Sequence, residues 1–227
     1  MQFSWFGKRQ RVPGGSIRSL TARDRNCRRA RLMALEQFEE RHLLAISVVG
    51  DEVLVNRQTS GTQSSTPGGL AVGSDAVGNF VVAFQGAGPG DSTGVFGQRF
   101  DAQGGIEQGE FRANSFTSNS QTQSSLAMSA DGRSVIAWSG SGPTDDKGIY
   151  FQRYDASGTP QGGQVRANST RVGTQNNPVV GMAESGEFVI VWAGMGADGQ
   201  AIYFQRYSAT GYPLGGESRA NTAVPGA

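Results

Sequence analysis

The chain of 227 residues repeats one sequence pattern three times, at intervals of 53 or 54 residues. The peptide GVFGQRFDA at 94–102 returns as GIYFQRYDA at 148–156 and as AIYFQRYSA at 201–209. Large aromatic residues keep nearly the same spacing at Phe84, Trp138 and Trp192. A period of this length indicates a solenoid, a propeller or an array, which limits the architecture before any local pattern is considered.

Each unit also has the pattern of four short strands separated by turns. In the second unit the expected strands are residues 125–129, 134–138, 149–154 and 164–168. Residues 130–132 contain Asp-Gly, which favours a hairpin, and residues 155–158 suit a type I turn. Residues 140–148 read as a longer glycine-rich loop. Four antiparallel strands per repeat are typical of one β-propeller blade.

We therefore predict an all-β, propeller-like domain over residues 47–227, with four-stranded repeats at about 57–114, 115–168 and 169–221. Residues 53–56 resemble the fourth strand of an incomplete unit that precedes them. Because propellers typically close with about four to eight blades, three units indicate an incomplete ring. The chain is then a fragment of a longer array, or it self-associates, or its strands stack as an open solenoid.

The last repeat gives a reason to expect self-association through open edges. End repeats normally need a polar outer face, and no capping segment is evident after the third unit. Its apolar strand residues are Val189, Ile190, Val191, Ile202 and Phe204. We expect the isolated domain to self-associate or to be poorly soluble.

The head of the chain differs from this body in charge. Residues 1–42 hold 10 Lys/Arg against 4 Asp/Glu, whereas residues 43–227 hold 10 against 15. This asymmetry predicts a basic, largely disordered leader over 1–46, separate from a mildly acidic body. The body has no basic stripe, so nucleic acid is not an expected partner. No apolar segment reaches the 18 residues expected of a transmembrane helix.

The end of the leader resembles the LEPR-XLL type N-terminal motif of large exported proteins in planctomycete-like bacteria. The resemblance covers residues 28–46, behind an Arg-rich head. Matching residues are Leu35, Glu36, Glu39, Arg41, Leu43 and Leu44, while Phe38 replaces the usual Leu and the Pro is missing. The resemblance implies export or display at the cell surface. The pattern of an ordinary secretory signal is not present, because an acidic segment separates the basic head from a short apolar stretch.

Few side chains offer catalytic or metal chemistry. Cys27 and His42 are the only cysteine and histidine, and both lie in the leader, so we expect neither a Ser-His-Asp nor a Cys-His site, and no cofactor. Glycine-rich loops at 86–91, 140–146 and 194–198 each contain Asp. They supply too few oxygens for a typical calcium site, and we interpret them as turns.

The polar residues that recur in every repeat admit either a ligand-binding or a structural interpretation. We interpret Gln98, Gln152 and Gln205 as structural side chains that hydrogen-bond neighbouring blades, rather than as a ligand ladder. We expect Asn114, Asn168 and Asn221 to cap the exit of the fourth strand, and the aromatic set at 84, 138 and 192 to lie in the core.

The expected function is binding, adhesion or scaffolding by a non-enzymatic exported or cell-surface protein, with an unknown protein or glycan as ligand. The repeat itself resembles uncharacterised modules of large bacterial surface proteins. The alternative is a degenerate propeller hydrolase of the sialidase type. Ser129-Ala-Asp-Gly-Arg-Ser134 matches only half of an Asp-box, and no distinctive acid pair is visible, so we expect no catalytic residues.

Overall fold

The computed structural model describes residues 52–57, 59, 61–64, 69–196 and 199–222. All of them belong to one compact unit, residues 48–227. The basic leader with its LEPR-XLL-like motif, Cys27, His42 and Asp198 lie outside the described residues. Within the described part of the chain, no helix is long and apolar enough to cross a membrane.

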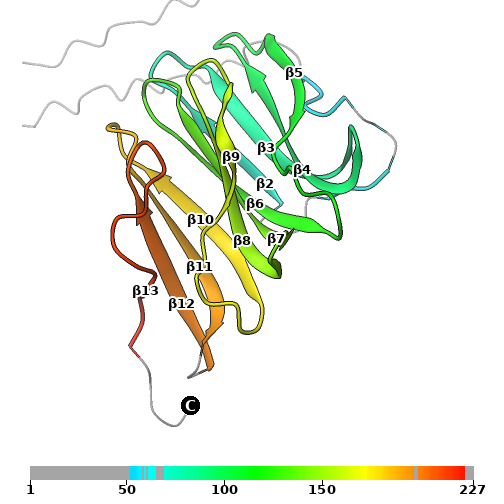
Figure 1. The fold of residues 1–227 in the computed structure, drawn as a ribbon. Helices are drawn as coiled ribbons and strands as arrows, with labels where there is room; N and C mark the ends of the chain where they lie inside the picture. The colour runs from blue at the N-terminus through cyan, green and yellow to red at the C-terminus, as the bar shows by residue number, and fades with distance from the viewer. Residues whose placement is uncertain (1–51, 58, 60, 65–68, 197–198, 223–227) are drawn as a thin grey trace, which may run out of the picture. The chain divides into compact units, whose positions relative to one another are not determined.

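The described residues form antiparallel strands that are grouped into three sheets (Figure 1). The first sheet contains β1 Gln63–Ser64, β2 Leu70–Ser74, β3 Phe80–Gly88, β4 Asp91–Phe100 and β5 Ile106–Arg112. The second contains β6 Gln121–Met128, β7 Ser134–Gly142, β8 Asp145–Tyr154 and β9 Pro160–Arg166. The third contains β10 Gln175–Met182, β11 Phe188–Gly196, β12 Gly199–Tyr207 and β13 Ser218–Arg219.

All three sheets have the same width and the same order of strands. In the first sheet β1 and β2 pair with successive parts of β3, so together they correspond to β6 and β10. Three glutamines mark this correspondence, because Gln63, Gln121 and Gln175 each pair with a glycine of the next strand. The prediction of an all-β fold with three four-stranded, propeller-like repeats is confirmed.

The turns predicted within the second repeat are present. Gly132 N–H donates to the carbonyl of Ser129 at 2.9 Å, and Gly158 N–H donates to Asp155 at 2.9 Å. Gly132 has a φ of 89°, which explains why glycine follows Asp131 there. Residues 53–56, expected to be a fourth strand, are not in a strand, although Asn56 lies at the repeat position of Asn114.

The prediction of a long loop over 140–148 was wrong. Strands β7 and β8 continue pairing through this segment, from Gly140 opposite Gly148 to Gly142 opposite Asp145. Gly142 is glycine because the ring of Tyr150 lies where a Cβ would project. Gly88 with Phe96 and Gly196 with Tyr203 repeat this contact in the other sheets. The glycines therefore accommodate an aromatic ring rather than marking a loop.

The core lies between the sheets, which stack face to face in chain order. The first junction, between the first and second sheets, buries Val81, Ala83, Val95, Ala113, Leu126, Ile136, Trp138, Tyr150 and Tyr154. The second junction, between the second and third sheets, buries Val135, Ala137, Ile149, Phe151, Ala167, Val180, Phe188, Ile190, Trp192 and Tyr207. The aromatic set at 84, 138 and 192 is buried, as predicted.

The two faces of a sheet therefore have different compositions. We call the face that points toward the next sheet in the chain the forward face, and the opposite one the rear face. The second sheet presents Ile149 and Phe151 on its forward face and Trp138 and Tyr150 on its rear face. At the first junction the forward face buries Val81, Ala83, Val95 and Ala113, whereas at the second the forward face also supplies the aromatic ring of Phe151.

Candidate functional site

The recurring glutamines bond within their own sheet, so the prediction of bonds between blades was wrong. Gln152 Nε2 donates to the carbonyls of Arg153 at 2.9 Å and of Gly162 at 3.3 Å. Gln205 bonds in the same way to Arg206 and Gly215. The pairing of the third and fourth strands is irregular at this point. The buried glutamine amide supplies a donor to carbonyls there, which is a structural role.

The neighbouring arginines make the contact between sheets that was expected of the glutamines. Arg153 Nη1 donates to the carbonyl of Ala209, in the turn before the last strand of the third sheet, at 3.1 Å. Arg99 is buried, forms an ion pair with Glu107 and lies near Asp155 of the second sheet. Hydrogen bonds from Ser157 and Thr159, together with the charge of Arg99, lower the pKa of Asp155. The arginines therefore link successive sheets.

The recurring asparagines close the exit of the fourth strand, as predicted. Asn114 Oδ1 accepts the N–H of Val95 at 2.8 Å, and Asn168 Oδ1 accepts that of Ile149 at 2.8 Å. Asn221 does the same for Ile202 at 2.9 Å. The asparagine amides of the first two repeats also donate to an aspartate in the β3–β4 or β7–β8 turn, Asp91 or Asp145. These two aspartates therefore have a turn role.

A further set of recurring contacts, which we call the exit clamp, joins each fourth strand to the exit of the preceding repeat. Gln164 Oε1 accepts the N–H of Ser115 at 3.0 Å. Glu217 accepts the N–H groups of Ser169 and Thr170 together with both hydroxyls. Glu110 accepts the N–H of Arg57 at 2.7 Å, at the equivalent position. The incomplete unit at 53–56 is thus held on the first sheet like a true repeat exit.

A buried tyrosine and the aspartate of the half Asp-box are both engaged in contacts of the fold. Burial raises the pKa of Tyr150 to about 12, and its hydroxyl donates to the carbonyl of Asp145 at 2.7 Å. In the half Asp-box, Asp131 accepts the Ser129 hydroxyl at 2.6 Å and pairs with Arg133 at 2.8 Å, on an exposed turn. Among the described residues, no three His, Cys, Asp or Glu side chains gather as metal ligands would.

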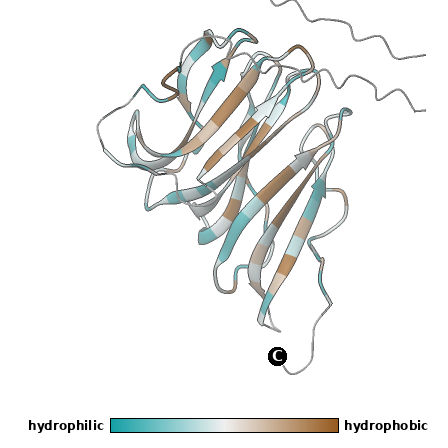
Figure 2. Ribbon diagram, turned by 180° about the vertical axis from the view of Figure 1, so that it is seen from behind, coloured by the Kyte–Doolittle hydropathy of each residue, from teal (hydrophilic) through white to brown (hydrophobic). Residues whose placement is uncertain are grey.

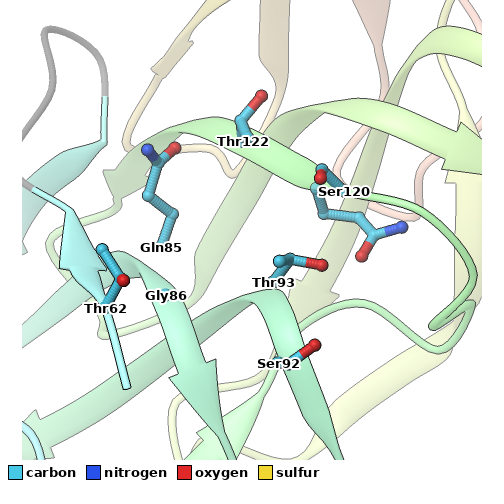
Figure 3. A pocket seen from close by; sticks show the side chains of 8 residues that line it. Thr62, Gln85, Gly86, Ser92, Thr93, Ser120 and Thr122 are labelled. Atoms are coloured by element: carbon cyan, nitrogen blue, oxygen red, sulfur yellow. The ribbon is translucent and has the colours of Figure 1, made fainter.

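One pocket lies at the first junction, where the β3–β4 turn of the first sheet meets the entry of β6. Its volume is about 150 Å³. It is lined by Thr62, Gln85, Gly86, Ser92, Thr93, Ser120, Gln121 and Thr122. Figure 3 shows Thr62 and Gln85 on one side, Ser92 and Thr93 on another, and Ser120 and Thr122 on the segment that faces them. Every polar side chain of the lining is an uncharged hydroxyl or amide.

The surrounding hydrogen bonds hold the pocket walls in place. Gln85 is 6% exposed, and its side-chain oxygen accepts the N–H of Gln123 from the second sheet. Gln121 is 1% exposed, donates to the carbonyl of Ser118 at 3.1 Å and accepts from Asn114 at 3.3 Å. The Thr93 hydroxyl donates to the carbonyl of Asn119 at 3.2 Å and still has its lone pairs to accept a hydrogen bond. The pocket is therefore preformed.

The second junction offers a different surface at the equivalent positions. Asp146 and Lys147 replace Ser92 and Thr93, and Ser139 replaces Gln85. The Ser139 hydroxyl donates to the carbonyl of Gln175 at 2.8 Å. The uncharged, hydroxyl-lined pocket is thus particular to the first junction. Sequence reasoning missed it because it concentrated on residues that repeat.

No family model matches the chain, and no curated protein matches it. Among solved structures, one match is the endo-arabinase from Bacteroides thetaiotaomicron VPI-5482. The two chains are 15% identical, and the match covers 70% of this chain and 66% of that one, with a TM-score of 0.41. The match spans less than two thirds of the enzyme. Similarity at this level carries no information on activity.

Proposed function

We propose that this chain is a non-enzymatic repeat module of an exported or surface protein, which binds a neutral polar ligand such as a glycan. The observation that carries the proposal is the preformed pocket at the first junction, whose polar lining consists of hydroxyls and amides alone. Uncharged hydroxyls and amides can both donate to and accept from sugar hydroxyls. A pocket of about 150 Å³ fits part of one sugar ring or a polyol end, not a complete oligosaccharide.

The use of the repeated side chains supports binding rather than catalysis. Gln152, Arg153 and Asn168 each bond to backbone carbonyls or amides that hold strands or sheets together. Glycoside hydrolysis commonly uses two carboxyl groups that flank the scissile bond, whereas the pocket lining contains none. A sialidase-like hydrolase is therefore the weaker alternative.

Binding can be tested on the full chain with a panel of neutral oligosaccharides, measured by isothermal titration calorimetry. We expect a member of the panel to bind, and the double variant Thr93→Val/Ser120→Ala to weaken it at least about tenfold, because two hydroxyl contacts with the ligand are lost. The matched control is Thr210→Val, in a turn of the third sheet, which should bind normally. Equal weakening by the control would contradict a site at the first junction.

Catalysis is tested on the same oligosaccharides by measuring new reducing ends after long incubation. We expect none. Turnover that a single Asp or Glu substitution abolishes would contradict the non-enzymatic proposal and favour the hydrolase.

Export rests on the resemblance at Leu35–Glu36, Glu39, Arg41 and Leu43–Leu44. Deleting residues 1–46 should keep the chain inside a host that exports the full-length form, as measured by cell fractionation. Export of the shortened chain would contradict this part of the proposal.

A further inference from the structure

The forward face of the third sheet carries the residues that are buried in the other two sheets. Val81 and its counterpart Val135 are 3% and 0% exposed, and Val95 and its counterpart Ile149 are both 0% exposed. In the third sheet Ile202, the counterpart of Ile149, is 40% exposed. The forward face of the third sheet comprises Val179, Val189, Val191, Ile202, Phe204 and Arg206. Figure 2 shows apolar bands on the strands of this last sheet.

The first sheet has a matching open area on its rear face. Val72 is 67% exposed, whereas its counterparts Leu126 and Val180 are 8% and 7% exposed against the preceding sheet. Leu70, beside it on β2, is 62% exposed. The outer edge of this face is already occupied by the segment at Arg57, whose N–H donates to Glu110. The open area therefore follows β2, away from that exit clamp.

Charge adds a second element of complementarity. Within the chain, the arginine on a forward face meets the turn between the third and fourth strands of the next sheet, as Arg153 does at Ala209. Arg206 is exposed and lines an open depression of about 430 Å³ with Met182, Glu187, Val189 and Leu214. Asp101, in the corresponding turn of the first sheet, occupies the position of Asp155, which lies near Arg99.

We propose that the forward face of the third sheet binds the open rear face of the first sheet in a second copy of this chain. The contact places β2 of the other copy where β6 and β10 lie at the two junctions within the chain, here against β10 and β11. The rear face of β3 takes no part, because Val82 and Phe84 are only 9% and 6% exposed. The contact pairs Arg206 with the second copy's Asp101. Because the two surfaces differ, the association is head-to-tail and leaves a free face at each end, so it can extend beyond a dimer.

Two substitutions at exposed positions test the two faces one at a time. Ile202→Glu disables the forward face of the third sheet, and Val72→Glu disables the rear face of the first. In the full chain we expect concentration-dependent oligomers by light scattering, and at least about tenfold weaker association in either variant, because a charge is buried without a partner. Val165→Glu is the matched control, since Val165 is 41% exposed on an outer edge strand, and it should associate normally.

Mixing the two variants gives the decisive result. Ile202→Glu keeps its rear face and Val72→Glu keeps its forward face, so an equimolar mixture should form a dimer and stop there. Circular dichroism and thermal unfolding of each variant verify that it is folded. A monomeric wild-type chain at all concentrations would overturn the proposal. So would association that Val72→Glu leaves intact, which would indicate contact between two third sheets.

The proposed ion pair has its own test. Arg206→Glu and Asp101→Arg should each weaken association, and the double variant should recover it because the pair is restored with reversed charges. No recovery in the double variant would contradict the docking register.

Discussion

The two junctions of this molecule pack the same positions with different residues. At the second junction Phe151, on the third strand of its sheet, packs on Tyr207 with ring centroids 4.9 Å apart. The equivalent position at the first junction is Gly97, and its space is filled by Phe111 from the fourth strand. Phe111 lies 5.1 Å from Tyr154, the counterpart of Tyr207. The interface keeps an aromatic pair although the strand that supplies one ring has changed.

The exit clamp differs between the junctions in a similar way. Gln164 is neutral, and its one side-chain oxygen accepts from the N–H groups of Ser115 and Phe116 and from the Ser115 hydroxyl. Glu217 is a carboxylate that accepts from two N–H groups and two hydroxyls. Hydrogen bonds to charged groups are the stronger ones. The repeat therefore conserves volume and hydrogen-bond direction, while the strength and pH response of each junction depend on its own residues.

The largest loss of stability should come from truncating the aromatic side chain that fills each junction, Phe151 or Phe111. Phe151→Ala removes a fully buried ring at the second junction and should cost about 3–5 kcal/mol in free energy of unfolding. Phe111→Ala, at a partly buried ring, should cost about 2–3 kcal/mol at the first. Denaturant unfolding measures the totals, and hydrogen exchange shows which sheet loses protection.

The two variants should lose hydrogen-exchange protection in different sheets. Phe151→Ala should expose amides of the third sheet and Phe111→Ala those of the first, because each repeat contacts mainly its neighbours. Val165→Ala, at an exposed edge position, is the control and should change little. Equal losses of protection in all three sheets for both variants would show that the junctions do not act separately.

The exit clamps should give the next largest effect. Glu217→Ala leaves the N–H groups of Ser169 and Thr170 without their acceptor and should cost about 1–2 kcal/mol. Gln164→Ala should cost about 1 kcal/mol or less at the first junction. The measurement is denaturant unfolding of both variants beside the wild type. A larger loss for Gln164→Ala would reverse the order of strength that we assign to the clamps.

Much of the fold could be predicted because it depends on local patterns and their repetition. The 54-residue period, the Asp-Gly turn at 131–132 and the spacing of Trp138 and Trp192 together located strands, turns and core. The glycine segment at 140–148 was mistaken for a loop because sequence alone does not show that Tyr150 lies across Gly142. A glycine required by a close ring contact and a glycine in a loop look the same in the sequence.

The contacts between sheets were harder to predict. Alternation along a strand places Gln152 and Arg153 on opposite faces, but it does not reveal the irregular pairing that brings Gln152 to its own sheet's carbonyls. The pocket combines residues such as Gln85, Thr93 and Thr122, which differ from their counterparts in the next repeat. The second glutamine set, at 63, 121 and 175, does recur and could have been found from its spacing.

The two tryptophans offer a smaller test of the same comparison. Trp192 Nε1 donates to Gln175 at 3.1 Å, whereas Trp138 Nε1 is buried without a hydrogen-bond partner among the described residues. Trp192→Phe should therefore cost about 1 kcal/mol more than Trp138→Phe, because only the former loses a bond and leaves a buried acceptor unsatisfied. Paired denaturant curves measure the difference. Equal costs would mean that Trp138 has a partner in solution.

The smallest effect is the acid response of the second junction. Burial of Glu217 favours its neutral form, but hydrogen bonds from Thr170 and Ser169 outweigh this and lower its pKa below the ordinary value of 4.5. A carboxyl with a lower pKa in the folded state stabilises the fold fully above its unfolded pKa, and this contribution is lost as the pH falls through the folded value. The side chain of Gln164 does not ionise, so the stability of its exit clamp at the first junction should not change with pH. Below about pH 4.5, hydrogen-exchange protection should fall more in the third sheet than in the second.

Asp131 and Asp155, whose pKa values are also lowered, lie in turns of the second sheet. The pH dependence of Glu217→Gln should therefore be subtracted from that of the wild type, since both proteins keep these aspartates. If the two pH profiles are parallel, Glu217 does not make the second junction acid-sensitive, and the two clamps differ only in their number of hydrogen bonds.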